Sequence, residues 1–185
     1  MAPPEVVASA VDAVAKLGNE VVLGHYNVAL DRMNPLWKER TAKKIDGGMA
    51  ALEKQLSGAA AQMVQNGISM ISFQPQGQPR SYEVGPGRKV EKVNGQEMER
   101  GVFNQWLVLV PTTAKVRIVP PKDSKSASKP VFIETIGFQV AISDKGKNDW
   151  TFIDGSGLSV NDLRSLYGTL PADMKFPPVE KREAR

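Results

Sequence analysis

Apolar residues recur at a helical spacing through the first part of the chain. Within residues 4–33 they fall close to every 3.6 positions. The members of this row are Val7, Val11, Val14, Leu17, Val21, Val28 and Ala29. Gly18-Asn19 is a candidate break within the row. Asn34-Pro35 should end it, because the residue before a proline is disfavoured in the α region.

A second helical stretch is predicted between residues 36 and 67. A short helix over residues 36–45 precedes a longer one, for which Asp46 is a candidate N-cap. The apolar face of the longer helix consists of Met49, Leu52, Leu56, Ala59 and Met63. Asn66-Gly67 is expected to end this helix, since asparagine and glycine tolerate the left-handed backbone of a C-terminal cap.

Strand patterns follow from residue 68 onward. Residues 68–73 predict a short strand, and the prolines and glycines between 75 and 87 indicate edge strands or irregular arms. Asn94-Gly95 favours a tight hairpin turn. Residues 102–110 are the strongest strand, and their apolar run from 106 to 110 indicates burial on both faces. Residues 115–119 are expected to continue that strand after a bend at Pro111.

Two further strands and a helix complete the pattern. A long strand is predicted over residues 131–143, with a turn at 144–149 and a returning strand at 150–153, where Trp150 is interpreted as a packing residue. Ser159 and Asp162 form an S-x-x-D variant of the capping box, with Leu158 and Leu163 at the staple positions. The loop from 120 to 130 is expected to be mobile, either as a lid or as a plain loop. We expect one domain over residues 1–178 and a flexible tail over 179–185.

The order of these elements predicts the α+β class, with N-terminal helices packed on an antiparallel sheet and a short C-terminal helix. Residues 106–113 read WLVLVPTT, residues 140–143 read VAIS, and residues 150–155 read WTFIDG before the closing helix. In this order the stretch from about 20 to 178 resembles uncharacterised bacterial proteins of the nuclear-transport-factor-2-like (cystatin-like) superfamily. The resemblance implies a strongly curved, cone-shaped sheet with the helices on its concave face and a pocket between them.

That resemblance does not select a function. Some members of the superfamily are isomerases or dehydratases, many only bind, and many form dimers through the sheet, so the fold alone leaves the chemistry open. It therefore implies a ligand-binding pocket and a homodimer through the sheet, without naming a substrate.

Composition narrows the classes of function. The chain has 185 residues, of which 41% are hydrophobic, so it is long and apolar enough to bury a core. No apolar run approaches the roughly 18 residues of a membrane span. The absence of cysteine excludes thiol catalysis, zinc–thiolate sites and iron–sulfur clusters. The first residues lack the features of a signal peptide. Both a cytoplasmic location and a periplasmic or secreted one after removal of a leader remain open.

The net charge of +4 is weak support for nucleic-acid binding. The basic residues concentrate in the predicted loop and tail, at Lys122, Lys125, Lys129, Lys181, Arg182 and Arg185. Neither group is interleaved with the aromatic residues on which bases would stack. We therefore expect these charges to serve solubility.

Glu134 is the leading candidate for chemistry. It shares one face of the long predicted strand with the apolar residues Phe132, Ile136, Phe138, Val140 and Ile142. A carboxylate in such a row lies at the edge of a pocket or is buried, and burial would raise its pKa and suit it to act as an acid or base. Two simpler explanations stand beside this one. A bulge at Gly137 would place Glu134 in solvent, or Arg117 on a neighbouring strand would pair with it.

His25 is the single histidine and lies at helical spacing from Val21 and Val28. This spacing predicts that it faces the core, either as a packing residue or as a proton carrier opposite Glu134.

The residues predicted to line a ligand pocket are Tyr26, Trp37, Tyr82, Trp106, Arg117 and Glu134. Neither a metal site nor a cofactor is expected, since a single histidine and scattered carboxylates show no ligand spacing. The favoured hypothesis is a non-catalytic domain that binds a small apolar molecule or a protein partner. The alternative is an isomerase- or lyase-like enzyme that uses Glu134 as an acid or base, together with His25 or a tyrosine.

Overall fold

The computed structural model describes residues 1–85, 88–120 and 129–184. The side chains of residues 88–89 and 99–101 lie outside that description. Most of the predicted loop from 120 to 130 also falls outside the described residues.

The described part of the chain has the predicted α+β composition. Its helices are α1 (Pro4–Val22), α2 (Tyr26–Asp31), α3 (Pro35–Lys43), α4 (Gly48–Gln65) and α5 (Val160–Leu166). Its strands are β1 (Ile68–Pro75), β2 (Arg80–Val84), β3 (Arg88–Val93), β4 (Gln96–Gly101), β5 (Gln105–Ile118), β6 (Val131–Asp144), β7 (Thr151–Asp154) and β8 (Glu180–Glu183).

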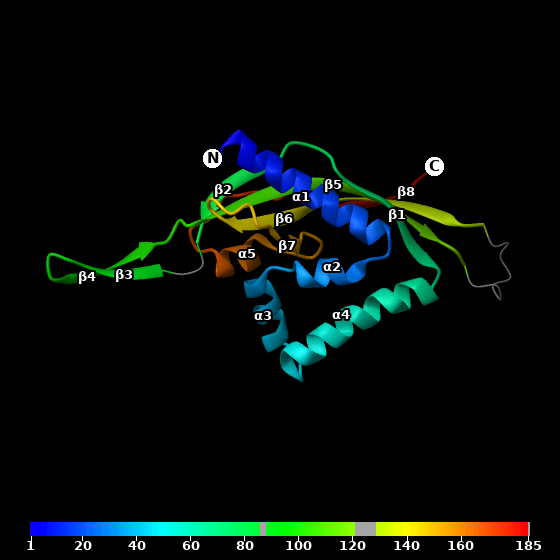
Figure 1. Cartoon of the computed structure of the whole chain (residues 1–185), viewed down its shortest axis with the longest axis horizontal. Helices are drawn as coiled ribbons and strands as arrows, with labels where there is room; N and C mark the ends of the chain where they lie inside the picture. The colour runs from blue at the N-terminus through cyan, green and yellow to red at the C-terminus, as the bar shows by residue number, and fades with distance from the viewer. Residues whose placement is uncertain (86–87, 121–128, 185) are drawn as a thin grey trace.

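Two long strands form the centre of a six-stranded antiparallel sheet. β5 and β6 pair along their whole length, from Gln105 opposite Asp144 to Ile118 opposite Val131. β1 and β2 share the free edge of β5, whereas β7 and β8 share the free edge of β6. The predicted Asn94-Gly95 hairpin is confirmed as β3–β4, which projects away from the body (Figure 1).

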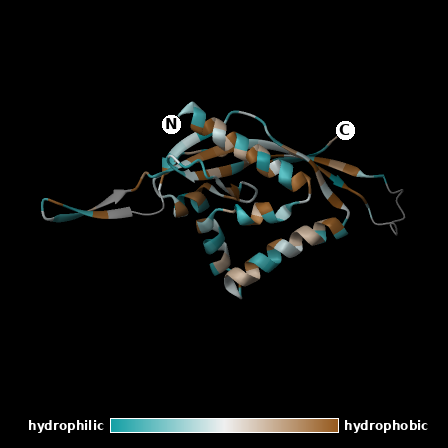
Figure 2. Ribbon diagram, in the orientation of Figure 1, coloured by the Kyte–Doolittle hydropathy of each residue, from teal (hydrophilic) through white to brown (hydrophobic). Residues whose placement is uncertain are grey.

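Both faces of the sheet are covered by other parts of the chain. α1 packs on the face that carries Val108 and Ala141, while α5 and the residues after it pack on the face that carries Leu107 and Val140. Residues 107–110 are each no more than 1% exposed, which confirms the predicted burial on both sides. Figure 2 shows the hydrophobic residues along these central strands, close to α1. The sheet is not strongly curled (Figure 1), so the curvature implied by the resemblance is not confirmed.

The predicted end of the first helical region at Asn34-Pro35 is confirmed, and Asn34 forms a junction between layers. Its side-chain oxygen accepts hydrogen bonds from the backbone N–H groups of Leu36 and Trp37, both at 3.1 Å, and so caps α3. Its side-chain nitrogen lies 3.2 Å from the Tyr167 hydroxyl, and its backbone N–H donates to the carbonyl of Phe152 at 2.8 Å. α3 is thereby joined to β7 and to the end of α5.

The predicted break at Gly18-Asn19 is wrong, because α1 continues to Val22. Gly18 lies where α1 packs closely against β1. A Cβ atom there would lie 2.1 Å from Cδ1 of Phe73 on β1. The turn after α1 comes instead at Gly24, whose φ of +87° suits glycine. The predicted cap at Asp46 is also wrong, because α4 begins after Gly47 with no side-chain cap.

β5 passes through Pro111 without interruption, where a bend was expected. The Pro111 carbonyl accepts a hydrogen bond from the backbone N–H of Gln76. The backbone hydrogen-bonding groups of residue 111 therefore point toward the β1–β2 connection and not toward β6. The missing N–H of proline therefore costs no hydrogen bond between β5 and β6.

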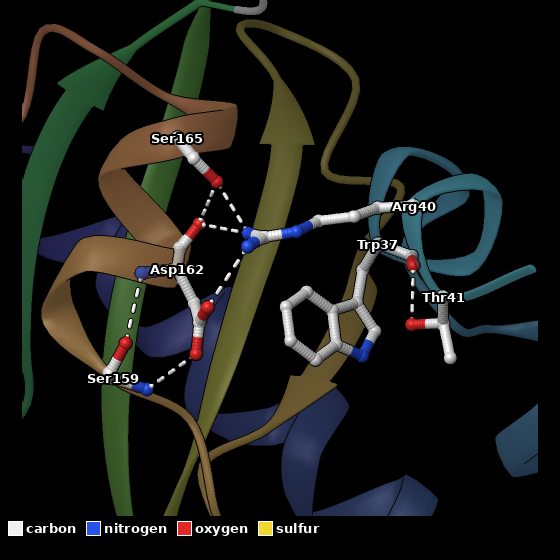
Figure 3. A network of polar contacts seen from close by, with 6 residues as sticks. All are labelled: Trp37, Arg40, Thr41, Ser159, Asp162 and Ser165. Atoms are coloured by element: carbon white, nitrogen blue, oxygen red, sulfur yellow. Dashed lines mark hydrogen bonds and ion pairs between the residues drawn. The ribbon is translucent and has the colours of Figure 1, made fainter. Parts of the chain in front are cut away.

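The capping box before α5 is confirmed, and it connects to α3. Ser159 accepts a hydrogen bond from the backbone N–H of Asp162 at 3.0 Å, and the Asp162 carboxylate accepts one from the backbone of Ser159 at 3.1 Å. The same carboxylate lies 3.0 Å from the Arg40 guanidinium, which also donates to the Asp162 carbonyl and to Ser165 (Figure 3). We call these contacts the α3–α5 clasp.

The end of the chain also differs from the expected flexible tail. Residues 180–183 form β8 and pair with residues 133–136 of β6. The free edge of β6 beyond β7 offers unpaired backbone groups, and the end of the chain supplies their partners.

Replacing Gly18 by alanine should destabilise the fold even though alanine favours helices. The added methyl group must displace Phe73 or its backbone, and overpacking of this kind costs about 1–3 kcal/mol. Urea unfolding followed by circular dichroism measures the change. Gly58→Ala in α4 is the matched control, because nothing lies within 4 Å of the added atom, and it should be neutral or stabilising. Equal effects of the two substitutions would contradict the packing role of Gly18.

The α3–α5 clasp should make stability depend on the ionisation of Asp162. Hydrogen bonds from Ser159, with the nearby Arg40 charge, hold the pKa of the Asp162 carboxyl below its usual value. Its contribution is therefore present at neutral pH and is lost as the pH falls through that lowered pKa. Asp162→Asn should cost about 1 kcal/mol at pH 7 and progressively less below pH ~4. Urea unfolding at several pH values tests this, with the exposed Asp173→Asn as control. If the loss of stability in Asp162→Asn did not change with pH, the charge of the Asp162 carboxylate would not contribute to stability.

Candidate functional site

A wide groove of about 1190 Å³ lies between α1 and the connection from β1 to β2. We call it the α1 groove. One wall is a row on α1 that includes Val7, Ala8 and Val11, and the other includes Pro75 and Pro79. Its lining is therefore largely apolar.

The groove exists because α1 is apolar over a wider arc than the sheet covers. Ala10, Val14 and Leu17 are buried against the sheet, whereas Val7 and Val11, which lie beside them on the helix, are only partly buried. The position of α1 is set in part by the residues just before it, where the Ala2 backbone N–H donates to the Ser81 hydroxyl at 2.9 Å.

Few charged groups reach the α1 groove. The charged side chains that line it are those of Asp12 and Arg80. The Asp12 carboxylate is engaged by Lys16 at 2.9 Å on the same helix. Arg80 forms no ion pair with any residue that the structure describes. The groove is thus apolar with a cation at one side.

Glu134 lies on the predicted face of β6 but does not have the predicted environment. The register with β5 is unbroken through Gly137, so no bulge displaces it. Its carboxylate accepts a hydrogen bond from Arg182 of β8 at 2.8 Å, and Lys115 lies directly opposite on β5. The Arg182 hydrogen bond, foremost, and the nearby cations hold the pKa of Glu134 below its usual value rather than raising it.

Arg117 does not supply the partner that was predicted for Glu134. It lies opposite Phe132 in the register of β5 and β6 and is exposed. Arg182 takes its place because β8 pairs with β6 on the edge away from β5 and sets Arg182 beside Glu134.

His25 does not face the core as predicted. Because α1 ends at Val22, His25 lies in the link before α2, outside the helical spacing. Its side chain is 58% exposed, and Nδ1 lies 2.6 Å from a carboxylate oxygen of Glu20. Glu134 and His25 therefore have different partners, and the described contacts do not join them.

The four predicted aromatic residues lie in different surroundings. Trp37 packs against the core on the α5 side with the Arg40 guanidinium 5.7 Å from its ring, and Trp106 packs against the core on the α1 side beneath Lys145, at 4.5 Å. Tyr26 begins α2 and is partly buried. Tyr82 alone among the four lines the α1 groove. Trp150 is a packing residue as predicted, being 4% exposed, and its indole N–H donates to Ser9 at 2.9 Å.

A smaller polar cavity of about 250 Å³ lies near the end of β6. Gln105 donates a hydrogen bond to the Asp144 carboxylate at 2.8 Å, and this bond is the main reason that the pKa of Asp144 is lowered. Burial raises the pKa of Tyr167 above its usual value. Asp144 therefore stays ionised and Tyr167 stays protonated at neutral pH, which leaves neither poised to exchange a proton.

The described residues contain no group of three or more acidic, histidine or cysteine side chains that could hold a metal ion. Within the same part of the chain, no helix has the length and apolar character needed to cross a membrane.

The residue pattern did not indicate most of the α1 groove. Val7 and Val11 were assigned to the core face, and Pro75 and Pro79 only to strand punctuation. One feature of the sequence pointed to it. The apolar positions of α1 cover a wider arc of the helix than packing against the sheet alone requires. Nothing in the local pattern indicated which residues would form the opposite wall.

The pKa of Glu134 should depend on Arg182. In the intact protein, titration of the Glu134 carboxyl carbon by NMR should give a pKa below the usual value, because the charged form accepts the Arg182 hydrogen bond. Arg182→Gln should move it upward, and the removal of Arg117 by Arg117→Gln should move it less. A Glu134 pKa above the usual value would restore the idea of a buried acid.

Comparison with known proteins identifies no relative. No family model matches the chain, no curated protein matches it, and no solved structure matches its fold.

Proposed function

We propose that this protein is a non-catalytic binding domain that takes a small, mainly apolar molecule in the α1 groove. The observation that carries the proposal is the apolar lining of a groove of about 1190 Å³. Sites for small organic ligands are typically concave, largely apolar and about 300–1,000 Å³ in volume, with a few polar groups that set orientation. At about 1190 Å³ the α1 groove is slightly larger than this range, and its walls carry polar groups that include Gln74, Arg80 and Ser81.

The different partners of the candidate acid and base support a non-catalytic function. An isomerase- or lyase-like reaction needs a proton donor and acceptor within reach of one substrate. Glu134 is engaged by Arg182 and has a lowered pKa, while His25 is mainly exposed and beside Glu20. The binding hypothesis needs only the groove.

Two expectations from the sequence stay predictions. Membership of the nuclear-transport-factor-2-like superfamily, with its cone and concave pocket, has no matching family model or structure behind it. The homodimer through the sheet is likewise a prediction, and a measurement of mass in solution would decide it.

A charge placed in the α1 groove should weaken the binding of an apolar probe. Ala8 lines the groove and is exposed, so Ala8→Glu adds a carboxylate there without disturbing the core. The uncharged dye N-phenyl-1-naphthylamine, followed by fluorescence, should bind the unmodified protein. Its affinity for Ala8→Glu should fall at least about tenfold, because burying an unpaired charge with the dye is unfavourable.

Ala61→Glu is the matched control, since Ala61 is an exposed helical alanine on α4 outside the groove. It should leave the dye affinity unchanged, and both variants should keep the unfolding temperature of the unmodified protein. The proposal would be contradicted if the Ala8→Glu variant bound the dye as tightly as the unmodified protein. It would also be contradicted if Ala61→Glu lost as much dye affinity as Ala8→Glu.

A further inference from the structure

A further cavity, distinct from the two already described, lies on the opposite face of the sheet from α1. It has a volume of about 460 Å³ and lies between the β1–β2 connection and the segment that leads from α5 to β8. We call it the C-terminal pocket. Its apolar surface is provided by Pro111, Ile136 and Phe176. The Phe176 ring is anchored against the buried Phe138 ring, with centroids 4.9 Å apart, so this surface is held in place by the core.

The charged residues that line the C-terminal pocket are of one sign. Arg80 and Lys175 line it, and none of the described lining residues is acidic. Both cations are exposed, and neither forms an ion pair with a described residue. Arg32 and Arg40, by contrast, each contact a carboxylate. Two unpaired cations beside a concave surface produce a positive potential that attracts anions.

The polar groups of the C-terminal pocket also favour a ligand that accepts hydrogen bonds. The side-chain oxygen of Gln76 already accepts a hydrogen bond from the Thr113 hydroxyl at 2.6 Å. The NH₂ group of Gln76, which is a donor, is available to a ligand. Arg80 and Lys175 are donors as well. A carboxylate or phosphate group, which accepts several hydrogen bonds, matches this set.

We propose that the C-terminal pocket binds an organic anion. Its acidic group pairs with Arg80 and Lys175, and its apolar part lies on Phe176 and Ile136. The acidic group is a carboxylate or a phosphate ester, because the two share the chemistry that the pocket recognises. The C-terminal pocket lies on the opposite face of the sheet from the α1 groove, and its charged lining residues are all cations. Arg80 borders both sites.

The test compares three ligands that carry the same eight-carbon chain: octanoate, octyl phosphate and uncharged octanol. Each is titrated into the full-length protein and followed by NMR of the backbone amides, at moderate salt. At least one of the two anions should bind and shift the amides of Gly77, Gly137 and Phe176. Octanol should bind more weakly than either binding anion, and the tighter of the two anions identifies the acidic group.

Three variants assign the binding to the pocket. Lys175→Gln should weaken binding of the anion about threefold to fivefold, as expected for one exposed ion pair, and Arg80→Gln should weaken it more. Lys54→Gln is the matched control, because it removes an exposed lysine of α4 that lies outside the pocket. Its affinity should be unchanged. All three substitutions are at exposed positions and should leave the unfolding temperature as it is.

Three results would overturn the proposal. The first is that neither anion binds at roughly 10 mM, a concentration well above the Kd of a specific site. The others are that octanol binds as tightly as the anions, or that Lys175→Gln leaves the affinity for the anion unchanged. The binding of the neutral dye in the α1 groove is measured separately and should not respond to Lys175→Gln. Failure of the anion site is therefore distinguishable from failure of the proposed function.

Discussion

The hydrogen bonds of Asn34 hold α3 against β7 and the end of α5. One buried amide caps α3 through Leu36 and Trp37, contacts the Tyr167 hydroxyl and continues on its backbone to Phe152. Asn34 is only 3% exposed, so a different placement of α3 would leave these groups without partners inside the protein. Each buried polar group without a partner costs about 1–3 kcal/mol. The junction therefore selects one arrangement of α3, β7 and the end of α5, and the α3–α5 clasp reinforces it.

With α3 and α5 held on one face of β5 and β6, α1 occupies the other. The connection from β1 to β2 then passes along the edge of the sheet between the two layers. The α1 groove lies on one side of that connection and the C-terminal pocket on the other, and Arg80 borders both. Pro111 lies beside the connection and gives up no hydrogen bond to β6, which lets the long central strand continue past this point. The two proposed binding surfaces are thus consequences of a sheet that is covered on both faces.

Glu134 illustrates how far residue patterns reach. Alternation along β6 correctly predicts its face, because that depends only on the period of a strand. Its partner depends on residues 180–183, which carry no strand pattern of their own and pair with β6 only because its edge is free. Arg182 then lowers a pKa that burial was expected to raise. The candidate site shows the same division, since Tyr82 was predicted to line a pocket while the proline wall opposite α1 was not.

The features that residue patterns predicted correctly are local ones. The stop at Asn34-Pro35, the capping box of Ser159 and Asp162, the Asn94-Gly95 turn and the doubly buried run at 107–110 each depend on neighbouring residues and a backbone period. That Gly18 lies within a helix depends on a long-range contact, because the ring that packs against it belongs to Phe73, more than fifty residues away along the chain. Long-range packing also sets where His25 lies, which cation pairs with Glu134 and where the cavities open. Those outcomes depend on which distant segments pack together, and side-chain burial over the whole molecule, rather than local propensity, selects that packing.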